Sequence, residues 1–312
     1  MPEFIPIASD PARPVHVPVL LREVLQQLQL SPGLIVVDGT VGAGGHSKEI
    51  VQRIQPGGQL IGLDRDARML EIAARQISSV SSVHQLHQAS YAELARVLAG
   101  LQIPAVDRVL LDLGLSSDQL ADKSRGFSFA ADGPLDLRFD TRQGESAADW
   151  LARVDEPELA DILDRYGEER HSRPLARALV AARHRAPIRT ARDLAEAVIQ
   201  ATSPGHHAGR KTPETSGKHP ATRVFQALRI VVNRELEQLE TMLGGVLFDS
   251  LKPGGIAGII TFHSLEDRLV KQAFREPKLW QLLTPKPIPA SPAEQRFNPR
   301  SRTAQLRVAK RL

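Results

Sequence analysis

Asp38, Asp64 and Asp112 each stand at or near the end of a short apolar run in the first third of the chain. Short runs of this kind are typical of strands that are buried on both faces. A carboxylate at a strand end can accept hydrogen bonds from the hydroxyl groups of a ribose, and it also attracts a cationic group. The three aspartates therefore indicate a site for a ligand that carries a sugar, a positive charge or both.

A glycine-rich turn follows the first of these aspartates, and such turns bring the backbone close to a bound small molecule. Dinucleotide-binding loops have the order Gly-x-Gly-x-x-Gly, but here Ser47 follows Gly42 and Gly44 where the third glycine belongs. The turn also has no lysine or arginine to bind a phosphate. S-adenosylmethionine carries a sulfonium and an ammonium group and no phosphate, so the carboxylate of Asp38 favours it as the cofactor. A dinucleotide-dependent oxidoreductase stays open as the alternative.

Helix-like and strand-like segments alternate along the first third of the chain. We expect helices at residues 17–30, 47–54, 67–77 and 91–99 and strands at residues 34–37, 59–63, 83–86 and 106–113. This alternation is typical of a parallel sheet with helices on both faces, in which ligands bind at the carboxyl ends of the strands. The expected fold class is therefore α/β, with a Rossmann-like sheet and an inserted all-helical subdomain.

The insertion is expected because the pattern changes after residue 115. Short helices are predicted at residues 146–152, 158–166, 174–183 and 191–201, followed by a helix at 222–251 and strands at 256–262 and 303–309 that rejoin the sheet. The predicted units are a flexible arm at residues 1–16, a discontinuous S-adenosylmethionine-binding domain at residues 17–125 and 221–312, and a helical domain at residues 126–220. The last of these includes a Gly/Pro-rich linker at residues 203–220.

The composition excludes several classes of mechanism. The chain has no cysteine, which excludes disulfides, thiolate metal sites and the cysteine adduct through which cytosine C5 is usually methylated. Direct transfer to nitrogen or oxygen needs no such adduct. No apolar run approaches the roughly 18–20 residues that span a bilayer, and residues 1–16 have no basic and apolar signal pattern. We therefore expect a cytoplasmic protein without a membrane partner.

Two segments are rich in basic residues, although the net charge of the whole chain is only +4. Residues 170–192 contain seven arginines and two histidines without a carboxylate, and residues 296–312 contain six lysines or arginines without a carboxylate. Such segments favour a polyanionic partner. A solvated helix face and a basic tail are the alternative for either segment taken alone.

Ordered motifs from about His16 to Arg311 together carry a family resemblance. They are residues 38–47 (DGTVGAGGHS), 63–66 (LDRD), 111–120 (LDLGLSSDQL), 125–129 (RGFSF), 132–138 (DGPLDLR), 166–170 (YGEER), 218–223 (KHPATR), 262–268 (FHSLEDR) and 298–302 (NPRSR). This set resembles the bacterial ribosomal RNA small subunit methyltransferase H family. Departures from the family pattern, at residues 1–21 and 205–217, lie outside the cofactor loop.

The resemblance implies a class I methyltransferase that uses S-adenosylmethionine to methylate N4 of a cytidine in the decoding region of 16S rRNA. It also implies that the inserted helical domain recognises the RNA substrate. Transfer to the exocyclic amine would be direct and in line, without a covalent enzyme adduct. By matching position, the resemblance implies cofactor contacts by Gly44, Gly45, His46, Asp64, Tyr91, Asp112 and Gln119. The charge argument above adds Asp38.

Asp112, Ser116 and Ser117 are the catalytic candidates, because amino-methyltransferases place an acidic or amide residue and a tight turn at the end of the fourth strand. Asp112 accepts a hydrogen bond from the amine in one interpretation and contacts the cofactor in the other, which the resemblance favours. Ser116 and Ser117 are candidates for the substrate side, and capping of the next helix by Ser116 is the alternative. For His46 we favour packing or hydrogen bonding near the cofactor over a role as general base.

His263 and Glu266 follow a late strand and are candidates for the same cleft, with a structural role as the alternative. His206, His207 and His219 lie in the linker without a carboxylate or thiolate at a usual ligand spacing, so we expect no metal. The expected partner is 16S rRNA in the small ribosomal subunit, and a homodimer stays open. A non-catalytic RNA-binding ribosome assembly factor is the remaining alternative function.

Overall fold

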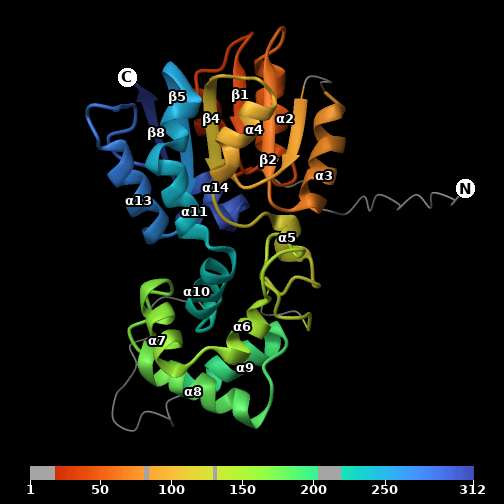
Figure 1. The fold of residues 1–312 in the computed structure, drawn as a ribbon, viewed down its shortest axis with the longest axis vertical. Helices are drawn as coiled ribbons and strands as arrows, with labels where there is room; N and C mark the ends of the chain where they lie inside the picture. Colours follow the sequence, from red (N-terminus) through yellow and green to blue (C-terminus); the bar gives the residue numbers. More distant parts are fainter. Residues whose placement is uncertain (1–17, 81–83, 129–131, 203–218) are drawn as a thin grey trace, which may run out of the picture.

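The computed structural model describes residues 18–80, 84–128, 132–202 and 219–312. Within them, an eight-stranded sheet and its covering helices form one lobe, and a cluster of helices forms a second lobe next to it (Figure 1). The arm expected at residues 1–16 and nearly all of the linker expected at 203–220 lie outside the described residues. Among the described helices, none has the length and apolar composition needed to cross a lipid bilayer.

Parallel strands form the centre of the sheet, in the order β3–β2–β1–β4–β5, and β8 continues it antiparallel to β5. β6 and β7 both pair with β8. The expected α/β class is confirmed, and the late strands rejoin the first sheet. The strands are β1 (Ile35–Asp38), β2 (Gln59–Asp64), β3 (His84–Gln88), β4 (Val106–Asp112), β5 (Leu251–Thr261), β6 (Trp280–Leu282), β7 (Ile288–Pro289) and β8 (Gln305–Arg311).

Helices cover both faces of the sheet, which explains the apolar strands. Val36 packs with α1, α2 and α3 on one face, and its neighbour Val37 packs with α4, α11, α12 and α13 on the other. A central strand therefore buries successive side chains in two separate apolar layers. The helices of this lobe are α1 (Leu21–Gln27), α2 (Gly45–Arg53), α3 (Ala67–Ser78), η1 (Tyr91–Glu93), α4 (Leu94–Gly100), α5 (Ser117–Ala121), α11 (Glu235–Thr241), η2 (Met242–Val246), α12 (Leu247–Ser250), α13 (Ser264–Phe274), α14 (Pro292–Phe297) and η3 (Pro299–Thr303).

The second lobe has an apolar core of its own. Leu159 and Leu163 on one helix and Leu175 and Leu179 on the next contribute to it, at the four-residue spacing that predicts a buried helix face. α10 also packs in this core, so by packing the helical lobe extends to Asn233, beyond the boundary expected at residue 220. The helices of the lobe are α6 (Ala147–Arg153), α7 (Glu156–Arg165), α8 (Ser172–Arg185), α9 (Ala191–Thr202) and α10 (Thr222–Asn233).

The single helix expected at residues 222–251 is broken at Arg234. This residue has a φ of 52°, in the left-handed region, and it separates α10 from α11. Arg65 donates a hydrogen bond from Nη1 to the carbonyl oxygen of Asn233 at 2.8 Å, which gives a carbonyl oxygen at the end of α10 a donor partner. The break allows α10 to pack in the helical lobe and α11 in the sheet lobe. Since Arg234 is neither glycine nor asparagine, the sequence contained no usual stop signal there.

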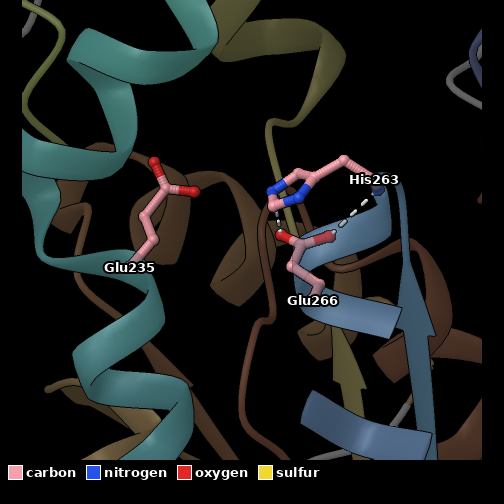
Figure 2. A group of neighbouring side chains, drawn as sticks. All are labelled: Glu235, His263 and Glu266. Carbon is pink, nitrogen blue, oxygen red and sulfur yellow. Dashed lines mark hydrogen bonds and ion pairs between the residues drawn. The ribbon is translucent and has the colours of Figure 1, made fainter. Parts of the chain in front are cut away.

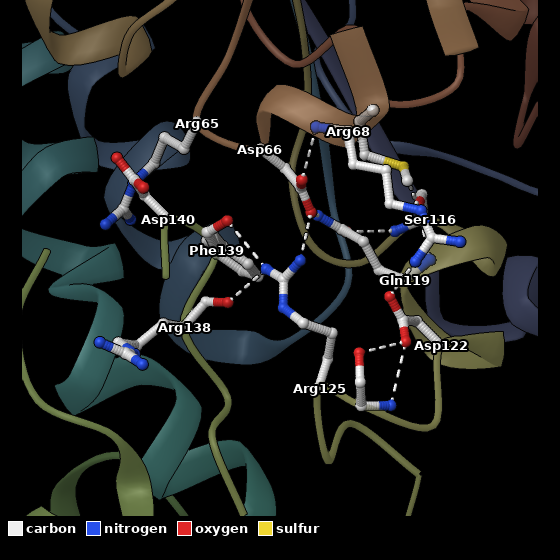
Figure 3. Close-up of polar contacts among 12 residues, drawn as sticks. Arg65, Asp66, Arg68, Ser116, Gln119, Asp122, Arg125, Arg138, Phe139 and Asp140 are labelled. Carbon is white, nitrogen blue, oxygen red and sulfur yellow. Dashed lines mark hydrogen bonds and ion pairs between the residues drawn. The ribbon is translucent and has the colours of Figure 1, made fainter. Parts of the chain in front are cut away.

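Polar contacts join the two lobes close to the end of β2 (Figure 3). Asp66 accepts hydrogen bonds from Arg125 at 3.0 Å and from Gln119 at 3.1 Å. Arg125 also donates to the carbonyl oxygens of Arg138 and Phe139, at 2.6 and 2.9 Å. The segment that leads into the helical lobe is therefore tied to the loop that follows Asp64 in the chain.

Candidate functional site

A cleft opens at the carboxyl ends of β1, β2, β4 and β5, where sheets of this kind bind ligands. The described residues that form its walls include all the candidates from the sequence except Asp38, Gly44, Ser117 and His263. Side chains from α11, from the start of α13 and from the carboxyl-terminal segment complete it. Its lining includes Gly39, Gly42, Gly45, His46, Asp64, Arg65, Tyr91, Asp112, Ser116, Gln119, Phe139, Glu235, Phe262, Glu266 and Arg300.

Asp64 ends β2, and backbone amides hold both of its carboxylate oxygens. Oδ2 accepts a hydrogen bond from the N–H of Gly42 at 2.8 Å, and Oδ1 accepts one from the N–H of Asp66 at 2.9 Å. Burial raises the pKa of Asp64 to about 6. Each oxygen keeps a second acceptor position, so Asp64 can still bind a pair of ligand hydroxyl groups.

The turn after β1 requires glycine at two positions. Gly42 and Gly44 have φ values of 52° and 91°, which other residues rarely adopt. A Cβ on Gly44 would also lie 3.0 Å from the Cα of Ala73 on α3. Gly44 therefore allows α2 and α3 to approach each other, whereas Gly42 and Gly45 line the cleft.

Asp38 is buried under this turn. Its Oδ2 accepts a hydrogen bond from the hydroxyl of Ser47 at 2.6 Å, and its Oδ1 accepts one from the N–H of Thr40 at 3.2 Å. Burial raises its pKa to about 6. The charge argument from the sequence predicts Asp38 as a cofactor contact; in the structure its carboxylate holds the turn, and Asp38 is not among the residues that line the cleft. Ser47, which replaces the third glycine of a dinucleotide-binding loop, is the donor that makes this possible.

Asp112 has the largest pKa increase among the three strand-end aspartates. Its Oδ1 is buried and has no hydrogen-bond partner among the described residues, and its Oδ2 lies 3.5 Å from Nδ1 of His46. Burial, assisted by the charges of Asp38 and Glu266 and opposed by Arg300, raises the pKa of Asp112 to about 8. A carboxyl group with this pKa is mostly protonated at pH 7, and a cation beside it would favour the ionised form.

His46 and Tyr91 both line the cleft, and polar atoms of both side chains contact backbone carbonyl oxygens of the protein. Nε2 of the buried His46 lies 2.9 Å from the carbonyl oxygen of Val19. The hydroxyl of Tyr91 donates to the carbonyl oxygen of Glu235 at 3.5 Å, and burial raises its pKa. An imidazole fixed at both nitrogens suits the packing role proposed from the sequence better than proton abstraction.

Ser116 caps the short helix α5. Its hydroxyl accepts a hydrogen bond from the N–H of Gln119 at 3.0 Å, and Oε1 of Gln119 accepts one from the N–H of Ser116 at 3.0 Å. This reciprocal pair is a capping box, the alternative that the sequence left open. The hydroxyl of Ser117 contacts the guanidinium of Arg300 instead.

Further lining residues were not assigned to the site from the sequence, among them Arg65, Phe139, Glu235 and Arg300. Glu235 begins α11 and accepts two hydrogen bonds from Arg229, at 2.8 and 2.9 Å. These residues come from segments far apart in the chain, so no local spacing assigned them to the site. Arg65 and Arg300 lie in the motifs at residues 63–66 and 298–302, and Arg300 also lies in the basic segment at residues 296–312.

Comparisons with known proteins agree over nearly the whole chain. The model of the MraW methylase family matches residues 13–312. A protein of Sorangium cellulosum named ribosomal RNA small subunit methyltransferase H is 45% identical over 98% of this chain and 95% of its own length. A protein of the same name from Syntrophotalea carbinolica is 46% identical over 95% of this chain and 98% of its own length. The solved structure of a putative rRNA methylase from Clostridium thermocellum covers 96% of this chain and all of its own length, at 11% identity and a TM-score of 0.43.

Proposed function

The chain belongs to the MraW methylase family, and on this premise we propose that it methylates N4 of a cytidine in the decoding region of 16S rRNA. The methyl donor is S-adenosylmethionine, and the substrate is the RNA of the small ribosomal subunit. The observation that supports this most strongly is the cleft at the strand ends, where Asp64 and Asp112 meet the glycine turn.

The residues of the cleft fit this methyl donor. Asp64 keeps two acceptor positions that suit the 2′- and 3′-hydroxyls of a ribose. Asp112 lines the cleft with a buried oxygen that no described donor satisfies, which suits a cationic ligand. When bound, the cofactor supplies an electrophilic methyl group on its sulfonium. The residues that we assign to holding it are Gly45, His46, Asp64, Tyr91, Asp112 and Gln119.

The target amine needs help because its lone pair is delocalised into the cytosine ring. Acceptors for its N–H groups favour a pyramidal nitrogen whose lone pair can attack, so positioning supplies most of the rate gain. Asp112 at the end of β4 is the strongest catalytic candidate, because Ser116 is used in the capping box and Ser117 contacts Arg300. The absence of cysteine agrees with direct transfer without a covalent adduct.

We assign recognition of the RNA to the helical lobe. Arg173 and Arg185 are exposed on α8, where they can contact phosphates. In the carboxyl-terminal basic segment, by contrast, Arg307 pairs with Asp267 at 2.7 Å and lies in β8. The base must leave its stack to reach the cleft, which costs a few kcal/mol, and phosphate contacts would offset this cost.

The test is mass mapping of 16S rRNA from cells that lack this protein. We expect one decoding-region cytidine to lose its N4-methyl group, and we expect the wild-type chain to restore it. If every cytidine keeps its N4-methyl group in those cells, the substrate assignment is wrong.

Complementation with two variants separates an enzyme from a non-catalytic assembly factor. Asp64→Ala should bind S-adenosylmethionine at least tenfold more weakly, since a pair of charge-assisted hydrogen bonds is removed, and it should not restore the methyl group. Asp164→Ala, an exposed aspartate on α7, is the matched control and should restore it fully. Restoration by Asp64→Ala to the wild-type level would argue against this cofactor site.

A further inference from the structure

Glu235, His263 and Glu266 converge on one point between α11 and α13 (Figure 2). One potential ligand atom from each residue lies within 4.8 Å of the other two. Glu235 is the first residue of α11, and His263 and Glu266 stand at the amino terminus of α13. The breaks before these two helices therefore bring together residues that lie far apart in the sequence.

The ring of His263 is nearly buried and pairs with Glu266. Its side chain is only 9% exposed, and Nε2 lies 3.1 Å from Oε1 of Glu266. The ring also takes part in the capping box at the start of α13. Two ligands of a tetrahedral zinc ion, each about 2.0–2.1 Å from the metal, lie about 3.3 Å from each other. The contact therefore has a distance that suits a hydrogen bond and also suits two ligands that share a cation.

The surrounding hydrogen bonds orient the carboxylates of Glu235 and Glu266 and leave lone pairs that can bind a metal ion. Oε2 of Glu266 accepts a hydrogen bond from the N–H of Phe262 at 2.8 Å, which directs Oε1 toward His263. Arg229 pairs with Glu235, but each carboxylate oxygen keeps a second lone pair.

We propose that Glu235, His263 and Glu266 bind a divalent metal ion of zinc-like preference at the edge of the cleft. One imidazole nitrogen and two carboxylate oxygens suit such an ion and leave a coordination position for water. Glu235 and Glu266 line the cleft, so this position faces it. The site departs from the expectation of no metal, which considered only the linker histidines. It does not depend on the proposed methylation.

The test uses the full-length, untagged protein, stripped with a chelator and then dialysed against Zn²⁺ alone. Bound zinc is measured by mass spectrometry of the metal, and affinity by calorimetry. The wild type and the control His184→Ala, an exposed position on α8, should each retain one more zinc ion per chain than His263→Ala. The affinity of the site should fall at least tenfold in His263→Ala. Equal zinc content in all three proteins, or none in the wild type, overturns the proposal.

X-ray absorption of the zinc-loaded wild type gives an answer even if His263→Ala does not fold. We expect one imidazole and otherwise oxygen ligands around the zinc. Two or more imidazoles would place the ion on other histidines and overturn the assignment. No RNA or cofactor is present in either measurement, so failure of the metal site is distinguishable from failure of the proposed function.

Discussion

Burial and charge oppose each other at the carboxylates near the cleft. Burial raises the pKa of Asp38 and Asp64 to about 6 and that of Asp112 to about 8. A sulfonium or ammonium group near these residues would lower the same pKa values, because it favours the charged form. Binding of a cationic cofactor should therefore release protons, and most of them should come from the residue with the highest pKa in this group.

The affinity for S-adenosylmethionine should rise about tenfold between pH 6 and pH 8.5 and then level off, since each unit of pKa shift corresponds to about tenfold in affinity. The affinity rises with pH because Asp112 holds its proton below pH 8 without the cation and loses it when the cation binds. Calorimetry in buffers of different ionisation enthalpy measures both the affinity and the proton release. Asp112→Asn should bind more weakly and lose most of this dependence. A wild-type affinity that is constant over this range would contradict the prediction.

At the scale of the elements, the turns between strands and helices determine which side chains reach the cleft. After β1, the turn buries Asp38 and exposes Gly42 and Gly45 to the cleft. After β4, the capping box directs the side chain of Ser116 toward its own helix. The same turns that create the cleft therefore keep Asp38 out of its walls, and they engage the hydroxyl of Ser116 within the protein although Ser116 lines the cleft.

Replacement of Ser116 by alanine should lower the free energy of unfolding by about 1 kcal/mol, because a helix loses its amino-terminal cap. The kcat for methylation should stay within a few fold of the wild type. Chemical denaturation and a methyl-transfer assay measure the two effects. Ser79→Ala, an exposed serine after α3, should change neither. A loss of kcat of a hundredfold at unchanged stability would instead show a substrate role for Ser116.

At the scale of the whole molecule, the basic helix α8 and the strands whose carboxyl ends form the cleft lie in different lobes (Figure 1). Phe139 lines the cleft and follows the segment that leads into the helical lobe, and Arg125 ties this segment to the loop after β2. The arrangement allows an RNA to contact α8 through its backbone while one base enters the cleft. Mutations on α8 should therefore change the affinity for RNA, and mutations in the cleft should change methyl transfer.

The double charge reversal of Arg173 and Arg185 to glutamate should weaken binding of 16S rRNA at least tenfold, because two attractive interactions with phosphates become repulsive. The salt dependence of binding should also become shallower, by about 0.7 for each phosphate that the protein no longer neutralises. Filter binding at several salt concentrations measures both, and S-adenosylmethionine affinity should not change. Arg75→Glu on α3 is the control in the sheet lobe. An effect of equal size in the control would show that only the net charge matters.

Local patterns in the sequence were sufficient for the fold class and for much of the cleft. Apolar runs predicted β1, β2 and β4, because a strand buried on both faces needs apolar side chains at every position. Asp64 and Asp112 were predicted as neighbours, because parallel strands end at the same edge of a sheet. These features depend on residues close together in the chain, so their spacing carried the information.

Only the tertiary structure decided the contacts between distant residues. Asp38 does not line the cleft, and Ser47 and Thr40 bind its carboxylate. The helix break at Arg234 depends on packing in two lobes and has no local signal. Glu235 meets His263 only because that break and the strand β5 bring their helices together. Such contacts depend on three-dimensional distances that a linear pattern does not contain, and for that reason they appeared only in the folded chain.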